Sequence, residues 1–133
     1  MMVLVPDLYL GQAGGMHQYG RNHFTGVAAE ESAERLYRAE GGQALAVRWR
    51  CAEGEIDLVM AFPGEMVFVE VKARRGHAAD AVSPRQWARI GAAAARFLAE
   101  ETDGTLACRF DLVLVDRSGV VERIENAVSF DEW

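Results

Sequence analysis

The sequence predicts an α/β protein, a mixed central sheet flanked by helices in the order α-β-β-β-α-β-β. Three observations lead to this prediction. Apolar residues recur at helical spacing in two separate segments. Three short strand-like runs, joined by tight turns, lie between those segments. After the second helix the chain returns to two more strands, and such a helical crossover joins parallel strands of one sheet.

The first helix is expected from about Thr25, a candidate N-cap, to the stop signal Gly41-Gly42. Its apolar positions are Val27, Ala29, Ala33, Leu36 and Tyr37. Residues 1–22 contain four Gly and one Pro and show no periodicity. They are expected to form a loose N-terminal arm, with Met16 as an alternative start, which leaves 23–133 as a single domain.

Three strands are expected next, at Ala44–Cys51, Ile56–Phe62 and Met66–Ala73, with turns at Glu53-Gly54 and Pro63-Gly64 between them. The first strand alternates, with apolar side chains on one face and arginines on the other: Leu45, Val47, Trp49 and Cys51 against Arg48 and Arg50. The segment 74–81 is polar and is expected to be a loop.

The second helix is expected over Pro84–Glu100. Ser83 and Gln86 form a capping box around Pro84 at the first helical position. The apolar stripe is Trp87, Ile90, Ala94, Phe97 and Leu98. The last two strands are expected at Arg109–Val115 and Val120–Ile124, on either side of a turn at 116–119.

Charge is distributed unevenly along the chain. The 133 residues carry 14 basic and 20 acidic side chains, a net charge of −6, and Lys72 is the only lysine. The whole excess of negative charge lies in residues 100–133. This balance argues against a protein that coats nucleic acid through bulk positive potential, although the middle of the chain is locally basic.

Composition indicates an ordinary globular domain, with half of the residues hydrophobic and 26% charged. Cys51 and Cys108 form no CxxC motif and are expected to be buried thiols in a reducing compartment. The apolar start of the chain is too short to span a bilayer. We therefore expect a cytoplasmic protein with no membrane partner.

The third strand is the most informative segment. Because the side-chain period of a strand is two, Glu70 and Lys72 share a face. An ion pair on an exposed strand is the ordinary explanation of such a pair. Here apolar residues occupy both faces of the strand, which indicates a central strand covered on each side. Charges at the end of such a strand are costly unless they are paired or bind a metal ion.

Two further carboxylates are candidates for the same site. Asp57 interrupts the apolar second strand, and a short hairpin would bring it beside Glu70. Paired carboxylates on adjacent strands are suitable ligands for Mg²⁺ or Mn²⁺. Alternatively, Asp57 caps the preceding turn. Glu30 points with the apolar face of the first helix, where it is either a third site residue or a partly exposed boundary residue.

At this point the sequence resembles a known family. The relevant runs are Gly26-x-x-x-Glu30-x-x-Ala33, Trp49-Arg50, Gly54-Glu55-Ile56-Asp57-Leu58-Val59, Val67-Phe68-Val69-Glu70-Val71-Lys72-x-Arg74 and Arg109-Phe110-Asp111-Leu112-Val113. They look like the YraN family, small bacterial proteins grouped with the PD-(D/E)xK, or restriction-endonuclease-like, nuclease superfamily. The similarity covers about residues 20–130. A bare D…ExK arises often by chance, whereas GEIDLV followed at this spacing by FVEVKAR is specific.

The resemblance implies a restriction-endonuclease-like sheet and assigns roles residue by residue. It implies that Asp57 and Glu70, with the Val71 carbonyl, hold Mg²⁺ or Mn²⁺. Lys72 would orient the attacking water and stabilise developing charge, and Glu30 would be an additional helix-borne acid. Two more positions match family or superfamily features: Arg74 as a phosphate contact, and Gln86 as a polar residue on the helix after the ExK motif, with its capping role equally open.

The function expected from these residues is divalent-metal-dependent hydrolysis of DNA in repair or recombination. An endonuclease is expected in preference to an exonuclease. The DNA, branched or single-stranded, would be contacted by basic residues of the middle of the chain: Arg48, Arg50, Arg74, Arg75, Arg85 and Arg89. Trp49 could stack on a base, but its alternation with arginines favours a core position. The alternative is a non-catalytic nucleic-acid-binding or protein-adaptor domain. The small size is compatible with a homodimer.

Overall fold

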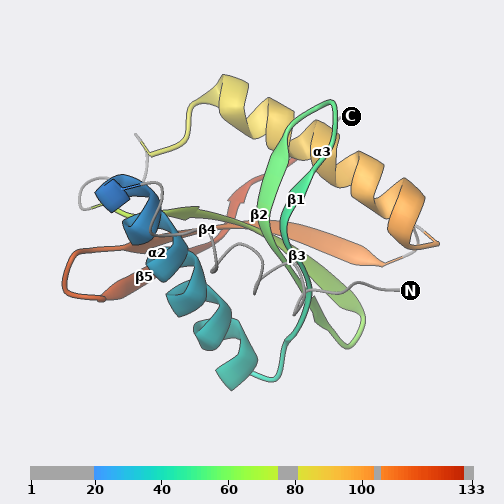
Figure 1. Ribbon diagram of the computed structural model, residues 1–133. Coiled ribbons are helices and arrows are strands. Elements are labelled where there is room, and N and C mark those ends of the chain that lie inside the picture. The colour runs from blue at the N-terminus through green and yellow to red at the C-terminus, as the bar shows by residue number, and fades with distance from the viewer. Residues whose placement is uncertain (1–19, 75–80, 104–105, 131–133) are drawn as a thin grey trace.

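A five-stranded mixed sheet lies between two helices (Figure 1). The computed structural model describes residues 20–74, 81–103 and 106–130, with side chains from residue 26 onward. The elements are α2 (Gly20–Ala39), β1 (Gln43–Arg50), β2 (Glu55–Phe62), β3 (Glu65–Lys72), α3 (Pro84–Glu101), β4 (Ala107–Val115) and β5 (Val121–Val128). This is the predicted order. None of the helices in these residues is long and apolar enough to cross a membrane.

The strands follow the chain order β1-β2-β3-β4-β5 across the sheet. The pairs β1–β2, β2–β3 and β4–β5 are antiparallel, and β3–β4 is parallel because α3 carries the chain back between them. In Figure 1, α2 and α3 cover opposite faces of this sheet. The predicted mixed sheet is therefore confirmed.

Each helix covers its own hydrophobic core. On the α3 face, Phe97 packs against Phe68 of β3, with ring centroids 5.9 Å apart. On the α2 face, Tyr37 belongs to a cluster with Val67 and Val69 of the same strand. Strand β3 is thus buried on both faces, as its sequence predicted.

Several element boundaries differ from the predictions. Helix α2 begins at Gly20 rather than near Thr25, and β5 continues to Val128 rather than ending at Ile124. The expected arm lies outside the described residues except for its last three residues, which belong to α2. The expected loop lies outside them over residues 75–80. The division into arm and domain stays a prediction.

The expected alternation in β1 was wrong. Val47 packs on the α2 face, whereas Leu45 and Trp49 pack on the α3 face. Two backbone irregularities account for this change of face: the register shifts between Ala44 and Ala46, and Arg48 has a φ of 55°.

Strand β2 changes face at the matching position, since Ile56 packs on the α3 side and Leu58 on the α2 side. The pairs Trp49↔Ile56 and Val47↔Leu58 enclose the position where Arg48 stands opposite Asp57. Asp57 therefore lies where the hairpin turns from one face of the sheet to the other.

A buried acid on the α2 face was missed by the sequence reasoning. Asp111 is 0% exposed and accepts hydrogen bonds from the Tyr37 hydroxyl at 2.6 Å, the Asn126 backbone N–H at 2.9 Å and the Arg109 guanidinium at 3.0 Å. Asn126 has a φ of 53°, beside the register shift between β4 and β5. Asp111 thus joins α2, β4 and β5, and its bonding is that of a structural residue.

Candidate active site

The candidate site opens where β2 and β3 stop pairing. Their backbone pairing ends at Leu58↔Val69, and one residue further along β2 the Asp57 carboxylate takes over as a hydrogen-bond acceptor. Asp57 Oδ2 accepts a hydrogen bond from the Val71 backbone N–H at 2.9 Å. The turn before β2 is closed by backbone hydrogen bonds between Cys51 and Gly54. Asp57 therefore bridges two strands rather than capping that turn.

Glu70 is the centre of the site. It is only 6% exposed, which excludes the ordinary exposed ion pair considered from the sequence. Its Oε2 atom lies 3.4 Å from Lys72 Nζ and accepts a hydrogen bond from Gln86 Nε2 at 3.1 Å. The prediction that Glu70 and Lys72 share a face is confirmed.

The two carboxyl groups behave as one unit. Burial, the negative charge of Asp57 and a hydrogen bond to Asp57 raise the pKa of Glu70 to about 9. Burial also raises the pKa of Asp57, against the hydrogen bonds from Val71 and Glu70. The pair therefore holds a proton more tightly than two separate carboxyl groups would.

Gln86 forms only half of the predicted capping box, because its side chain points into the site. Its backbone N–H donates to Ser83 Oγ at 3.1 Å, so Ser83 is the N-cap of α3. Its side-chain amide donates to Glu70 instead. Helix α3 therefore brings a polar group to the carboxyl pair from across the site.

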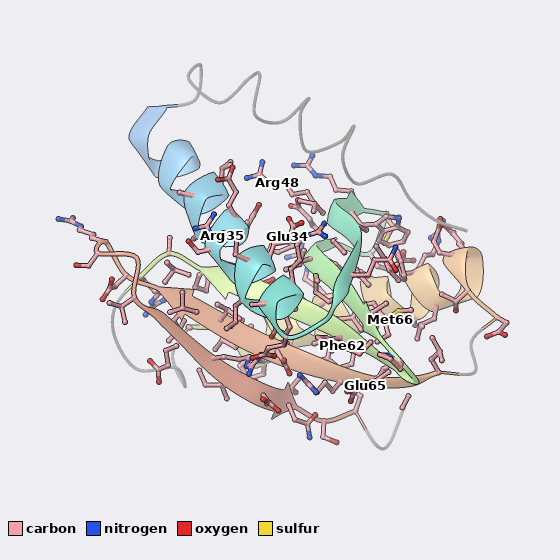
Figure 2. All side chains as sticks on the ribbon, turned by 90° about the horizontal axis from the view of Figure 1, so that it is seen from below. Glu34, Arg35, Arg48, Phe62, Glu65 and Met66 are labelled. Atoms are coloured by element: carbon pink, nitrogen blue, oxygen red, sulfur yellow. The ribbon has the colours of Figure 1, made fainter. Side chains whose placement is uncertain are left out.

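Glu30 joins the site electrostatically, from the α2 side. It forms an ion pair with Arg48 at 2.7 Å, in which the Arg48 and Glu30 side chains are 11% and 14% exposed. Burial and then the charge of Asp57 raise the pKa of Glu30 to about 7, outweighing the Arg48 partner. Glu30 is thus an inward-facing acid, and Arg48, which projects from β1 toward α2 in Figure 2, is held in that pair rather than displayed on the surface.

A cleft of about 420 Å³ lies over the carboxyl pair. It runs between the start of β2 and the first turns of α3, and is lined by Gly54, Glu55, Asp57, Glu70, Ser83, Arg85, Gln86, Arg89 and Ile90. The sequence reasoning did not single out Glu55, although it directly precedes Ile56-Asp57 in the most specific run. The charge of Glu55 contributes to the raised pKa values of Asp57 and Glu30.

The other predicted nucleic-acid contacts are dispersed. Arg50 is exposed and lies 3.5 Å from Glu55 at the edge of the sheet. Arg74 is exposed just beyond the end of β3, and Arg75 lies outside the described residues. Trp49 packs edge-to-face on Phe97, with centroids 5.2 Å apart, which confirms its core position.

The donor groups at the cleft suit a hard divalent cation. In the part of the chain that the structure describes, no three His, Cys, Asp or Glu side chains form a group that could hold a metal ion. Two carboxylates are nevertheless paired here, beside the backbone of Val71. Mg²⁺ commonly uses one or two carboxylates, and fills its remaining positions with water and substrate phosphate oxygens. The residues present therefore fit such an ion.

Comparison with known proteins identifies relatives along most of the chain. The model of the uncharacterised protein family UPF0102 matches residues 29–115. A UPF0102 protein of Ruegeria pomeroyi is 50% identical over 110 residues, which are 80% of this chain and 89% of the relative. A UPF0102 protein of Cereibacter sphaeroides is 48% identical over 109 residues, which are 80% and 93%. The matched region contains the carboxyl pair, Lys72 and the α3 wall of the cleft. The chain therefore belongs to the uncharacterised protein family UPF0102, the YraN-like family that its motifs resemble.

Proposed function

We propose that this protein is a Mg²⁺- or Mn²⁺-dependent nuclease that hydrolyses DNA phosphodiester bonds internally, in repair or recombination. The observation that carries the proposal is the pairing of the half-buried Asp57 with the buried Glu70, both with raised pKa values, beside Lys72 and an open cleft. Strongly raised carboxyl pKa values in a cleft are typical of functional sites. Cys51 and Cys108 are both free thiols, but the prediction that they are buried was wrong, since Cys51 is half-buried and Cys108 is exposed. Free thiols are consistent with action in the cytoplasm.

Each side chain has a defined task in this reaction. Asp57 and Glu70, with the Val71 carbonyl, would hold the cation. When bound, the ion polarises a phosphate oxygen and lowers the pKa of its bound water. Lys72 positions the attacking water with its ammonium group and offsets the negative charge that develops on the phosphate.

The surrounding residues orient these groups. Gln86 fixes the Glu70 carboxyl through its amide. Glu30 adds a third acid beside Asp57, with Arg48 balancing its charge. Arg74, exposed just after β3, is available to contact a substrate phosphate.

The test is a cleavage assay with branched, nicked and single-stranded DNA under titrated Mg²⁺ and Mn²⁺. Lys72→Ala should lower the cleavage rate by at least about 100-fold, because it removes a charge that acts on the transition state. Arg117→Ala, in the distant turn between β4 and β5, removes one positive charge elsewhere and should leave the rate unchanged. Thermal melting verifies that both variants fold.

Two results would refute the catalytic assignment. One is cleavage by Lys72→Ala at the wild-type rate. The other is an absence of cleavage by the wild type on every substrate with either ion.

A non-catalytic adaptor domain on the same fold is the second candidate. It is favoured by the internal bonding of Glu70, whose carboxyl already has Lys72, Gln86 and Asp57 as partners. The net charge of −6 also weakens non-specific attraction to phosphates. DNA or protein binding without any cation-dependent cleavage would support this function.

A further inference from the structure

Two arginines form the α3 wall of the cleft. Arg85 and Arg89 are four residues apart on the first turns of α3, so they project from one face of the helix. Both line the cleft and both are exposed. Neither makes a hydrogen bond or ion pair with any residue that the structure describes.

Most other arginines on the described surface are neutralised by acids. Arg96 pairs with Glu53 at 2.9 Å, and Arg123 pairs with Glu40 at 2.7 Å. The guanidinium groups without an acidic partner among the described residues are those of Arg35, which donates to Ser32 Oγ, and of Arg74, Arg85, Arg89 and Arg117. Of these, Arg85 and Arg89 lie together at the candidate site.

The two walls of the cleft differ in charge. Glu55 stands on the β2 side, next to Asp57, and the arginines stand on the α3 side. The turn before β2 approaches α3 closely, because a Cβ atom on Gly54 would lie 3.3 Å from the Arg89 carbonyl oxygen. An anionic ligand in the cleft would thus be repelled from the β2 wall and attracted to the α3 wall.

The cleft has few groups that could recognise a base. No aromatic ring is among the described residues that line it. Gln86 and Ser83, its neutral polar side chains, are engaged with Glu70 and with the Gln86 backbone. Base recognition needs stacking surfaces or free donors and acceptors, whereas phosphate recognition needs only positive charge.

We propose that Arg85 and Arg89 form a phosphate-binding pair, through which the cleft binds the phosphodiester backbone of a nucleic acid without reading its sequence. This inference rests on the proposed nucleic-acid function of the cleft, but not on catalysis. The backbone is common to DNA and RNA, and the experiment has an arm for each.

The test is fluorescence anisotropy with labelled 20-mers in EDTA, where no cation-dependent cleavage occurs. The protein is titrated into single-stranded DNA, duplex DNA and RNA of one sequence, and into DNA of a shuffled sequence. Each titration is repeated at several salt concentrations between roughly 25 and 200 mM NaCl, which defines the salt slope. Arg85→Ala/Arg89→Ala should weaken binding at least about tenfold at the lowest salt. It should also reduce the slope of log K against log salt by about 0.7–0.9 per arginine.

Two matched variants control for charge and for folding. Arg117→Ala should leave affinity and slope unchanged, because that guanidinium lies in the turn between β4 and β5. Arg85→Gln/Arg89→Gln removes both charges but keeps long polar side chains, and should lose affinity and slope as the alanine variant does, which preserves the test if the alanine variant does not fold.

The inference is overturned if the wild type does not bind in EDTA, if the alanine and wild-type slopes agree, or if the shuffled sequence binds more than about tenfold differently. The arm with the tighter binding shows whether the cleft prefers DNA or RNA, and a preference for either nucleic acid supports the inference. Cleavage is scored separately: arginine-dependent binding without cleavage refutes the nuclease and supports this site. Cleavage by the wild type, together with unchanged binding by the alanine variant, supports the nuclease and refutes this site.

Discussion

Asp57 and Glu70 form a coupled pair of carboxyl groups at the cleft. Burial raises the pKa of both groups, and the charge of Asp57 helps to raise the pKa of Glu70 to about 9, so the pair holds a proton more tightly than separate carboxyl groups would. A cation that replaces this proton would offset both the cost of burying the carboxylate charges and the repulsion between them. Without such a cation, the raised pKa of Glu70 lowers the stability of the folded chain as pH rises.

Glu70→Gln should stabilise the metal-free protein at alkaline pH. Because the folded-state pKa of Glu70 is raised, the folded chain binds more protons than the unfolded chain between about pH 4.5 and 9, and stability falls as pH rises through that range. Glutamine has no such dependence. We expect a gain of about 1–3 kcal/mol at pH 8, several degrees in Tm, that shrinks toward pH 5.

Thermal melts in EDTA at roughly pH 5, 6.5 and 8 measure this effect, because these values sample the range between the unfolded-state and the folded-state pKa of Glu70. Glu122→Gln, a change of an exposed acid in β5, is the control and should show no comparable trend. A Glu70→Gln variant that is equally or less stable than the wild type at pH 8 would contradict a shared proton.

The sequence predicted these residues to different extents. Strand alternation alone placed Glu70 and Lys72 on one face, and the hairpin brought Asp57 beside them. Arg48 was expected on one face with Arg50, but its positive φ accompanies a side chain that pairs with Glu30 instead. Asp111 was missed since its donors come from α2, β4 and β5, and no local pattern signals such a contact.

At the scale of elements, the site is assembled by two departures from ideal strand geometry. The β1–β2 hairpin changes face at Arg48 and Asp57, and β2 stops pairing with β3 beyond Leu58. Periodicity predicted the order and number of the elements, because each helix and strand buries an apolar face. It did not predict the change of face, which depends on a register shift and one unusual backbone angle.

Tyr37→Phe should destabilise the protein without altering the cleft. The Tyr37 hydroxyl is a donor to Asp111, which is fully buried, and its loss leaves that carboxylate less satisfied. The expected cost is about 1–3 kcal/mol, measured by urea unfolding. Affinity for DNA should stay at the wild-type value, since Tyr37 packs on the face opposite α3; reduced affinity in folded protein would contradict this separation.

At the scale of the whole molecule, the charge pattern has a structural explanation. The acidic last quarter supplies partners for Arg109 and Arg123 on β4 and β5: Asp111 and Glu125. Part of the negative charge of this quarter is therefore used in ion pairs on β4 and β5, while the exposed arginines Arg85 and Arg89 of α3 line the cleft. Composition revealed the imbalance along the chain, but only the fold shows which arginines are left without acidic partners among the described residues.

Calorimetric titration of Mn²⁺ into the protein at pH 7 tests the proposed cation site most directly. Repeating it in buffers of different ionisation enthalpy counts the protons released. We expect about one ion per chain with release of about one proton, retained in Glu122→Gln and lost in Asp57→Asn. No Mn²⁺ binding, binding without proton release, or equal binding by Asp57→Asn would contradict the assignment of Asp57 and Glu70 as a cation site.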